Sequence, residues 1–413
     1  MKRPRILALI QAGGQGSRLD VLTRETPKPA LPFAGGYRLV DFPLSNLRNS
    51  GIDDVWLSVQ FRAQDLADAV GNGKPWDLDR HHGGFRLVVP EQGAGSVADD
   101  GFVSGNAEEL LQNRDAIRAF APDALVVMSA DHVYRLDYVD VVVEHLDRGA
   151  ECTVVTTEVG LEDASNHATV TAGPDGRVTG FAYKPEEPTT GVVATEVFVY
   201  HPEVLVAELE RLHRELSLQA AAEGEPTEGS PLGDFGEHLL PALVARGRTF
   251  PHPLPGYWRD LGRPETYVAA HRELLTSDVG LFEPGWPILT NARSHLPARV
   301  HAGGTVVDSL LSPGCQVQGE VQTSVLGPGV VVGPGAVVAD SILFAGVRVE
   351  AGARVAWAVV DRDCVVGADA QVGGPSKTDG VDPDHLVMIG LDSVVGPGVR
   401  LEPGARLEPG TTA

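Results

Sequence analysis

The sequence has few cysteines and no long apolar run. Its three cysteines, Cys152, Cys315 and Cys364, stand far apart. An odd number of thiols at such spacing forms neither a disulfide framework nor a metal-binding motif, so we expect three small buried thiols in a reducing compartment. No stretch approaches the ~18 apolar residues of a membrane span. The start, Met1–Ile10, imitates a signal peptide, but its apolar run is only about six residues, so we expect a buried first strand and a cytoplasmic protein.

Basic residues are also scarce. The chain has 33 Lys and Arg against 56 Asp and Glu among 413 residues, a net charge of −23. This balance excludes a general binder of DNA or RNA backbones, which needs a basic face, and we expect no membrane partner. It leaves room for one small basic pocket that binds a phosphorylated metabolite. The hydrophobic content of 43% is enough for a core, and the length predicts two or three domains.

Residues 1–280 alternate short apolar runs with amphipathic stretches. The apolar runs are Ile6–Ile10, Val55–Val59, Leu125–Ser129 and Thr153–Thr157, and the amphipathic stretches include Arg62–Val70, Ala107–Phe120 and Tyr138–Arg148. This alternation predicts an α/β domain with a doubly wound, mostly parallel sheet, covered by helices on both faces. Ligands of such sheets bind outside the carboxyl ends of the strands. We interpret Glu223–Gly233, rich in Gly, Pro, Ser, Thr and Glu, as a mobile loop.

Glycine and proline, at 48 and 30 residues, make up about a fifth of the chain against a usual ~12%. Part of this excess belongs to a six-residue repeat near the C-terminus. Its aliphatic positions are Val325, Val331, Val337, Leu343, Val349 and Val355, and later Val395, Leu401 and Leu407. A hexapeptide period predicts a parallel β-helix, with one aliphatic side chain per face pointing inward and Gly and Pro at the corners. A Greek-key sandwich with repeated Gly-Pro turns is the alternative.

Gly373–Gly390 interrupts the period and is expected to be an excursion loop. We therefore expect a catalytic domain over 1–280, a linker over 281–300 and the β-helix over 301–413.

The strongest candidate site is the glycine-rich run from Ala12 to Leu19, directly after the first expected strand. Gly13, Gly14 and Gly16 let backbone N–H groups approach phosphate oxygens, and Arg18 and Lys28 can neutralise a triphosphate. The run is neither a Walker loop nor a dinucleotide fingerprint, because no Gly-Lys-Ser/Thr follows and Leu19 stands where a third glycine would be. By itself, a tight turn between strand and helix is an equally good interpretation.

Two carboxylates and one further lysine complete the set. Asp131 follows Leu125–Ser129 at the carboxyl end of a strand, where a carboxylate suits Mg²⁺, although a helix N-cap would also explain it. We expect the neighbouring His132 to pack or hydrogen-bond. Asp260 lies 129 residues further on, so the sequence cannot show whether the two acids meet; if they do, they could clamp Mg²⁺ between two phosphates. Lys184, stiffened by Pro185, could hold a sugar phosphate.

Taken together, these motifs resemble the sugar-phosphate nucleotidylyltransferases and, more narrowly, the glucose-1-phosphate adenylyltransferase family. The resemblance covers nearly the whole chain. The segments that carry it are Gly13–Leu19, Lys28–Ala30, Arg38–Asn46, Ala130–Tyr134, Asp234–Gly236, Tyr257–Gly262, Trp286–Ile288 and the hexapeptide tail.

The resemblance implies a Mg²⁺-dependent, in-line transfer from ATP to glucose 1-phosphate, giving ADP-glucose and pyrophosphate, and a left-handed β-helix tail. Catalytic roles are expected for Arg18, Lys28, Asp131 and Asp260, with the two aspartates as metal ligands. The expected nucleotide-binding residues are Ala12, Gly13, Gly14, Gly16, Ser17, Gln92 and Gly105. Lys184, Glu196 and Asp234 are expected to bind the sugar phosphate. An allosteric homotetramer, or a hetero-oligomer with a paralogue, is the family expectation.

The departures from the family pattern lie around the sugar and the base. The family commonly has Gly-Thr/Ser-Ala-Asp-Ala where this chain has Gly105–Glu109, an acid where it has Tyr183, and Ser-Met-Gly where it has Ala194–Glu196. A Trp-Tyr run becomes Phe102–Ser104, and Gln11 replaces an aliphatic residue. Losing the acid at Tyr183 removes an acceptor for sugar hydroxyls, and Glu196 is the candidate that restores a carboxylate. The phosphate and metal residues are intact, so the sequence favours an altered sugar or nucleotide preference over lost chemistry.

Two other functions stay open. A non-catalytic regulatory subunit of the same family would bind nucleotide without turnover. A β-helix acyltransferase would use a histidine between coils, for which His301 is the nearest candidate.

Overall fold

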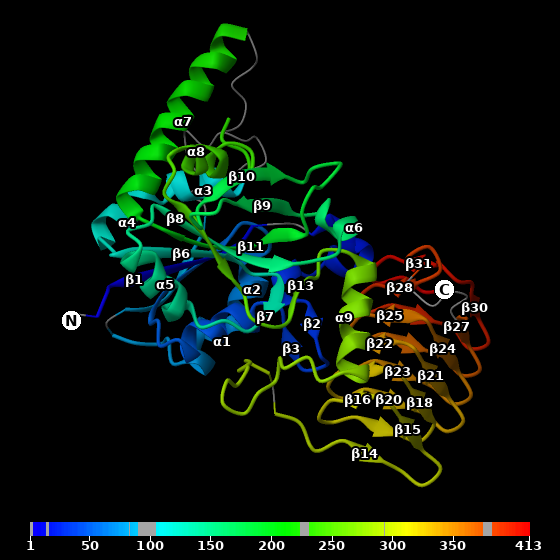
Figure 1. Ribbon diagram of the computed structural model, residues 1–413. Coiled ribbons are helices and arrows are strands. Elements are labelled where there is room, and N and C mark those ends of the chain that lie inside the picture. The colour runs from blue at the N-terminus through cyan, green and yellow to red at the C-terminus, as the bar shows by residue number, and fades with distance from the viewer. Residues whose placement is uncertain are drawn as a thin grey trace.

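The computed structural model describes residues 3–13, 16–81, 83–89, 105–223, 231–292, 294–374 and 382–413. An N-terminal α/β domain is followed by a triangular coil of short strands, which stands beside it (Figure 1). Within the described ranges, no helix is long and apolar enough to cross a membrane.

A nine-stranded sheet forms the centre of the first domain, in the order β10-β9-β11-β6-β1-β4-β5, with β8 between β11 and β12. The pairs β1·β4, β1·β6, β4·β5 and β8·β12 are parallel, whereas β11 runs antiparallel to β6 and β8. The strands are β1 Ile6–Ala12, β4 Asp54–Val59, β5 Gly84–Val88, β6 Ala124–Ser129, β8 Cys152–Glu158, β9 Ala168–Ala172, β10 Val178–Tyr183, β11 Val192–Tyr200 and β12 Thr249–Pro253.

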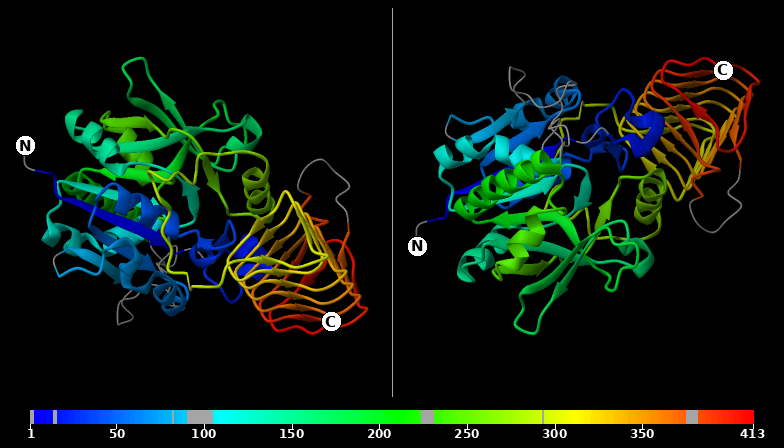
Figure 2. Two further views of the ribbon diagram at one scale, coloured as in Figure 1. Left: turned by 90° about the horizontal axis from the view of Figure 1, so that it is seen from below. Right: turned by 90° about the horizontal axis from the view of Figure 1, so that it is seen from above.

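Helices cover both faces of this sheet, as expected from its continuous apolar strands (Figure 2). Alternate residues of β1 enter different cores: Ile6, Ala8 and Ile10 pack with α1, α2 and α5, whereas Leu7 and Leu9 pack with α3, α4, α7 and α8. The helices are α1 Asp41–Asn49, α2 Ala63–Val70, α3 Asn106–Gln112, α4 Arg114–Phe120, α5 Tyr138–Asp147, α6 Leu161–Ala164, α7 Pro202–Glu223, α8 Leu239–Ala245 and α9 Pro264–Thr276. Short 3₁₀ segments are η1 Ser17–Thr23, η2 Lys28–Ala30 and η3 Gly71–Trp76.

The amphipathic stretch Ala107–Phe120 is helical, but it forms two helices, α3 and α4, with a break at Asn113. The side-chain amide of Asn113 donates to the carbonyl of Glu109 at 2.9 Å, so it competes with the regular helical bonds. Of the loop expected over Glu223–Gly233, α7 takes the first residue, and residues 224–230 lie outside the described part.

Three parallel sheets of six strands each build the C-terminal coil, the architecture of a hexapeptide β-helix. Its strands are β14 Arg299–Val300, β15 Thr305–Val307, β16 Leu310–Leu311, β17 Gln316–Val317, β18 Glu320–Gln322, β19 Val325–Leu326, β20 Val331–Val332, β21 Val337–Ala339, β22 Ile342–Leu343, β23 Arg348–Val349, β24 Arg354–Ala356, β25 Ala358–Val360, β26 Val365–Val366, β27 Gln371–Gly373, β28 Val387–Ile389, β29 Val394–Val395, β30 Arg400–Leu401 and β31 Arg406–Leu407. The Greek-key alternative is wrong, because every pairing in this region is parallel.

One aliphatic side chain per face does point inward, but the unbroken six-residue register is wrong. The core contains Leu326, Val332 and Val338 in place of Val325, Val331 and Val337, and then Leu343, Val349 and Val355 as expected. The coil shortens by one residue where β21 passes to β22. The predicted excursion loop Gly373–Gly390 contains β28, which pairs with β25 and so returns the chain to the coil. Residues 375–381 of that span lie outside the described part. All three cysteines are free and buried, as expected.

The coil packs against the first domain through a shared apolar cluster. Leu19, Phe33 and Tyr267 contact the group formed by Ile342, Phe344 and Met388. Polar contacts join the same surfaces: the guanidinium of Arg406 donates to Asp20 at 3.0 Å, and that of Arg362 donates to the hydroxyl of Thr26 at 2.9 Å. The β-helix therefore contacts the segment between the glycine-rich run and Lys28.

Candidate active site

A two-stranded sheet brings the two predicted acids together. Strand β7 His132–Tyr134 pairs antiparallel with β13 Trp258–Asp260, and His132 stands opposite Asp260. Because Asp131 immediately precedes His132, both carboxylates lie at the carboxyl end of β6. This pairing resolves the question that the 129-residue separation left open.

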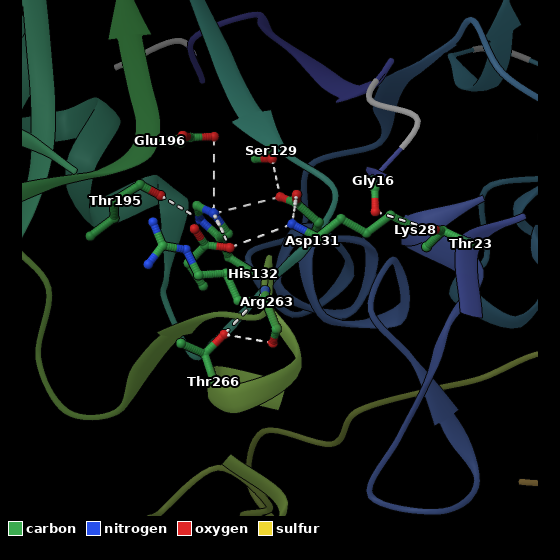
Figure 3. Close-up of polar contacts among 11 residues, drawn as sticks. Gly16, Thr23, Lys28, Ser129, Asp131, His132, Thr195, Glu196, Arg263 and Thr266 are labelled. Atoms are coloured by element: carbon green, nitrogen blue, oxygen red, sulfur yellow. Dashed lines mark hydrogen bonds and ion pairs between the residues drawn. The ribbon is translucent and has the colours of Figure 1, made fainter. Parts of the chain in front are cut away.

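Lys28 lies between the two carboxylates, and Figure 3 shows it beside Asp131. Its ammonium donates to Asp131 and lies 3.5 Å from Oδ1 of Asp260. Burial alone would lower the pKa of Lys28, but the two carboxylates raise it above its ordinary value. Conversely, although burial disfavours their charge, Lys28 and His132 hold the pKa values of Asp131 and Asp260 below the usual carboxyl range. Two ionised acids thus share one cation in a largely buried position.

His132 and Ser129 complete this group, and the sequence assigned neither to the site. The hydroxyl of Ser129 donates to Asp131, and Nε2 of His132 lies 3.5 Å from Asp131 and 3.6 Å from Asp260. Its Nδ1 is 3.0 Å from the carbonyl of Thr195, so the ring is fixed at both ends. Burial opposes protonation of His132, yet the surrounding carboxylates raise its pKa. The expectation that His132 packs and hydrogen-bonds is confirmed, and its ring also packs edge-on against Trp258.

The glycine-rich run reaches Lys28 through Gly16. Gly16 has φ 69, and a Cβ there would lie 2.9 Å from Cβ of Lys28, so a side chain would displace the lysine. Its carbonyl accepts hydrogen bonds from the hydroxyl of Thr23 and from the N–H of Leu19, both at 2.9 Å. A Cβ at Gly13 would approach the side chain of Gln60 at 3.0 Å. Close approach and conformation therefore both call for glycine at Gly16, whereas at Gly13 only the approach of the Gln60 side chain does.

The other predicted nucleotide residues are placed as follows. Ala12 is buried at the end of β1, whereas Ser17 and Arg18 are exposed on η1. Arg18 makes no hydrogen bond or ion pair with the residues that the structure describes. Gly14 and Gln92 lie outside those residues, as do Phe102, Val103 and Ser104.

Glu196 extends into the same group from a bulge in β11. The register of β11 against β8 shifts between Ala194 and Phe198, and Glu196, in the middle of the bulge, has φ 57. Its carboxylate lies 4.0 Å from Nε2 of His132, and its side chain is 52% exposed. Desolvation and the nearby Asp131 and Asp260 raise the pKa of Glu196, although His132 acts in the opposite direction.

A second group contains the expected sugar-phosphate residues Lys184 and Asp234. The hydroxyl of Tyr183 donates to Asp234 at 2.8 Å, and the ammonium of Lys184 lies 3.0 Å from that hydroxyl. Gly236 lets the Tyr183 ring approach, since a Cβ there would lie 2.1 Å from the ring. Where the family pattern has an acid, this chain thus has a phenol that occupies one oxygen of Asp234.

Gly105 joins this second group to the rest of the site. It has φ 87, and a Cβ at this position would lie 2.1 Å from the carbonyl oxygen of Gly233. The next residue, Asn106, accepts a hydrogen bond from the N–H of Phe235 at 2.6 Å and another from the Gln11 amide at 2.9 Å. The start of α3 therefore contacts both the end of β1 and the Asp234 segment.

Glu109 is a buried carboxyl group under this end of the sheet, and sequence reasoning missed it. It is 3% exposed, and burial raises its pKa to about 7 although Ser58, Gln11 and Gln60 hydrogen-bond to it. A signal was present, since Glu109 lies among the apolar residues Ala107, Leu110 and Leu111, and a carboxyl group is rarely buried.

Two of the characteristic segments turn out to be scaffold. Within Arg38–Asn46, Ser45 accepts a hydrogen bond from the N–H of Leu289 at 2.8 Å. Asn46 donates to the carbonyl of Tyr134 at 3.0 Å and accepts from the indole of Trp286 at 2.8 Å. These buried bonds hold α1 against residues 286–289 and against β7, and so they support the strand that carries His132.

The donor set suits a hard cation. One oxygen of Asp131 and one of Asp260 already face a shared positive charge, the Lys28 ammonium. Asp131, His132 and Glu196 also offer ligand atoms that all lie within 4.8 Å of one another. Carboxylate oxygens are the ligands that Mg²⁺ prefers, so Asp131 and Asp260 are the residues that could hold it.

Comparison with known protein families agrees with this two-part organisation. Residues 7–277 match the model of the nucleotidyl transferase family, and residues 295–385 match that of the GlmU-like C-terminal hexapeptide family.

Individual relatives carry a narrower name. The chain is similar to the glucose-1-phosphate adenylyltransferase of Clostridium acetobutylicum, with 33% identity over 335 residues, covering 80% of this chain and 84% of the relative. It is 35% identical over 329 residues to that of Thermotoga neapolitana, covering 79% and 74% of the two chains. It is 33% identical over 331 residues to that of Bacillus subtilis, covering 79% and 82%.

Proposed function

The chain belongs to the glucose-1-phosphate adenylyltransferase family of nucleotidyl transferases, and we propose that it transfers an adenylyl group from ATP to glucose 1-phosphate. The products are ADP-glucose, a precursor for glycogen or another α-glucan, and pyrophosphate. The observation that carries the proposal is the position of Lys28 between Asp131 and Asp260, beside Gly16 at the carboxyl end of the sheet.

The reaction needs no protein nucleophile or general base. A phosphate oxygen of the sugar phosphate, already anionic, attacks the α-phosphorus in line, and the bond to the pyrophosphate oxygen breaks. The protein contributes position and positive charge. Lys28 and Arg18 neutralise the triphosphate, and backbone N–H groups of the run that includes Gly13 and Gly16 approach its oxygens.

Asp131 and Asp260 are the residues that would hold Mg²⁺. When bound, the ion supplies positive charge that offsets the charge of the phosphates. With the ion held by the two aspartates, the Lys28 ammonium would be available to contact phosphate. Ser129 and His132 keep Asp131 oriented through their contacts with its Oδ1.

On the acceptor side, Lys184 and Asp234 are proposed to hold the sugar phosphate. Lys184 has φ 45, and its ammonium is close to the Tyr183 hydroxyl at 3.0 Å. A cation fixed in this way can meet the dianionic phosphate of the acceptor. We also propose, on the family expectation, a cytoplasmic, allosterically regulated homotetramer or a hetero-oligomer with a paralogue.

The test is a matrix of nucleoside triphosphates against sugar 1-phosphates with Mg²⁺, in which pyrophosphate is measured. We expect turnover with ATP and glucose 1-phosphate, loss of turnover when Mg²⁺ is chelated, and loss in Asp131→Asn and Asp260→Asn. Turnover only with a different pair would assign another nucleotidylyltransferase specificity. Nucleotide binding without turnover for any pair would refute the enzyme and favour a regulatory subunit.

A further inference from the structure

Glu196 is the one carboxylate of the active-site group whose placement the proposed reaction does not explain. It lies in the bulge of β11, where the pairing with β8 is interrupted between Ala194 and Phe198. Bulges beside active sites re-aim a side chain, and φ 57 places Glu196 in the left-handed region that strains a non-glycine residue. Strain of this kind persists where the surrounding structure holds it in place.

The surrounding structure does hold the bulge. The hydroxyl of Thr195 donates to the carbonyl of Val155 at 3.0 Å, and the carbonyl of Thr195 lies 3.0 Å from Nδ1 of His132. The residue before Glu196 is therefore fixed both to the sheet and to the ring that faces Asp131 and Asp260. As a result, the Glu196 side chain projects toward the same group (Figure 3).

The Glu196 carboxylate has no donor of its own. It accepts no hydrogen bond from the residues that the structure describes, and the nearest cationic group, Nε2 of His132, is 4.0 Å away. The ammonium of Lys28, in contrast, already forms ion pairs with Asp131 and Asp260. The Glu196 side chain is 52% exposed, so its carboxylate is accessible to a donor on a ligand.

The negative charge of Glu196 indicates which kind of substrate group would donate to it. Both substrates bring phosphates, so a third carboxylate beside Asp131 and Asp260 repels them unless a cation compensates it. A neutral sugar hydroxyl would donate a hydrogen bond to Glu196 but would leave its negative charge in place, whereas an ammonium both donates and neutralises that charge. An ammonium on the acceptor therefore suits a carboxylate at this position better than a hydroxyl does.

The position of Glu196 also selects the carbon that bears the ammonium. The phosphate on C1 of the acceptor must meet the α-phosphate next to Asp131 and Asp260. Oxygens of Asp131 and Glu196 and a ring nitrogen of His132 lie within 4.8 Å of one another, so Glu196 borders the place where C1 and its phosphate react. The substituent next to the C1 phosphate is the one on C2.

We propose that Glu196 is a specificity-determining residue, which pairs with the ammonium of a 2-amino-2-deoxy sugar 1-phosphate and makes it a better acceptor than glucose 1-phosphate. The inference rests on the proposed nucleotidyl transfer and names the acceptor class of that same site.

The experiment compares kcat/KM for 2-amino-2-deoxyglucose 1-phosphate, its N-acetyl derivative and glucose 1-phosphate, with ATP and Mg²⁺. We expect the wild type to prefer the amino sugar over glucose by about tenfold or more, equivalent to about 1.4 kcal/mol. The N-acetyl derivative, whose amide is neutral, should gain nothing. Glu196→Gln, which keeps the size of the side chain, should bring the amino-to-glucose ratio close to one. Glu196→Gly, which removes the strain at φ 57, should do the same.

The matched control is Glu187→Gln, which removes one charge from an exposed residue near Lys184 and should leave the ratio unchanged. The alternative role of Glu196 is to bind Mg²⁺, and the Mg²⁺ concentration that gives half the maximal rate distinguishes the two roles. If Glu196→Gln raises that concentration equally for both acceptors and leaves their ratio unchanged, Glu196 is a metal ligand and the proposal is overturned. A wild-type preference for glucose 1-phosphate would also overturn it.

Failure of the proposed function has a different signature, namely no pyrophosphate with any acceptor. In that case, equilibrium binding of the two sugar phosphates beside a non-hydrolysable ATP analogue still tests the inference. Tighter binding of the amino sugar in the wild type, lost in Glu196→Gln, supports it, and equal binding refutes it.

Discussion

Replacing Lys28 by methionine would leave Asp131 and Asp260 facing each other without their shared cation. At an effective dielectric constant of about 20, two unit charges 3.5 Å apart, the separation of Lys28 from Asp260, interact by about 5 kcal/mol before desolvation is subtracted. Removing one partner of a buried pair usually destabilises a protein by about 3–5 kcal/mol. Because the aspartates are 21% and 27% exposed, water relieves part of this loss, and we expect about 2–4 kcal/mol at pH 7.

The pH dependence of this loss follows from the pKa shifts. Lys28 holds the pKa values of both aspartates below normal, so the stabilisation is present above the ordinary carboxyl pKa and disappears as the pH falls through the depressed values. The raised pKa of Lys28 affects stability only as the pH rises above about 10.5. The difference between wild type and Lys28→Met should therefore be largest near neutral pH and shrink as the pH falls below about 4.

The assay is thermal unfolding of wild type and variant at pH 7 and at the lowest pH where both fold, with and without Mg²⁺. Mg²⁺ should raise the melting temperature of Lys28→Met more than that of the wild type, because it replaces the missing charge. We also expect kcat/KM to fall about 10²–10³-fold. Lys74→Met, at an exposed lysine, is the control. Equal destabilisation at both pH values, with no response to Mg²⁺, would refute the reasoning.

Three further predictions concern the surroundings of the site. Glu109→Gln should be more stable than the wild type at pH 8, by up to about 3 kcal/mol, and should gain much less at pH 5. The reason is that the wild type loses stability as the pH rises through the Glu109 pKa of about 7. Denaturant titrations of both proteins at both pH values measure the difference. Gly16→Ala should lower kcat/KM about 10²-fold, because its Cβ would meet Lys28 at 2.9 Å, and steady-state kinetics with varied nucleotide measure the loss. Arg406→Ala should cost about 1.5–3 kcal/mol and raise the nucleotide KM, since it removes a 3.0 Å charged bond to Asp20; thermal unfolding and kinetics measure both effects.

Each of these has a control that isolates its cause. Gly303→Ala introduces the same left-handed strain, at φ 88, but no heavy atom lies within 4 Å of the new Cβ, so activity should be unchanged. Arg400→Ala removes an exposed arginine that pairs with Glu402 at 2.9 Å, and it should leave the nucleotide KM unchanged. Glu108→Gln, one residue before Glu109, should not reproduce the stabilisation at pH 8. A matching effect in any control would remove the explanation given for its partner.

The fold was readable from the sequence because it depends on local periodicity. Four apolar runs each became a strand of the central sheet, and the tail became a β-helix, because burial on both faces of a parallel sheet leaves a continuous apolar run. Register was less readable. The inward position of the coil moved from Val325 to Leu326 because each coil contains turns of unequal length, and valine occurs at both positions. The break at Asn113 was not visible in the sequence, because the amphipathic pattern continues through it.

The site was readable only in pieces. The glycine-rich run, Lys28, Asp131 and Asp260 could each be named, since close approach and charge require these residue types. That Asp131 and Asp260 share Lys28 depends on the pairing of β7 with β13, a contact between distant segments that no local pattern encodes. Likewise, the sequence showed an acid at 196 without showing that a bulge turns it toward His132.

The sequence by itself therefore determined the α/β domain with its β-helix tail, the glycine-rich turn and the kinds of charged residue present, because periodicity, glycine and charge act over a few residues. The tertiary structure alone decided which charges meet. It placed one lysine between two acids, a phenol on Asp234 and the Glu196 carboxylate beside His132. Such contacts are fixed by the packing of the sheet and its bulge, because in a folded chain the distance between two charges depends on topology and not on their separation in sequence.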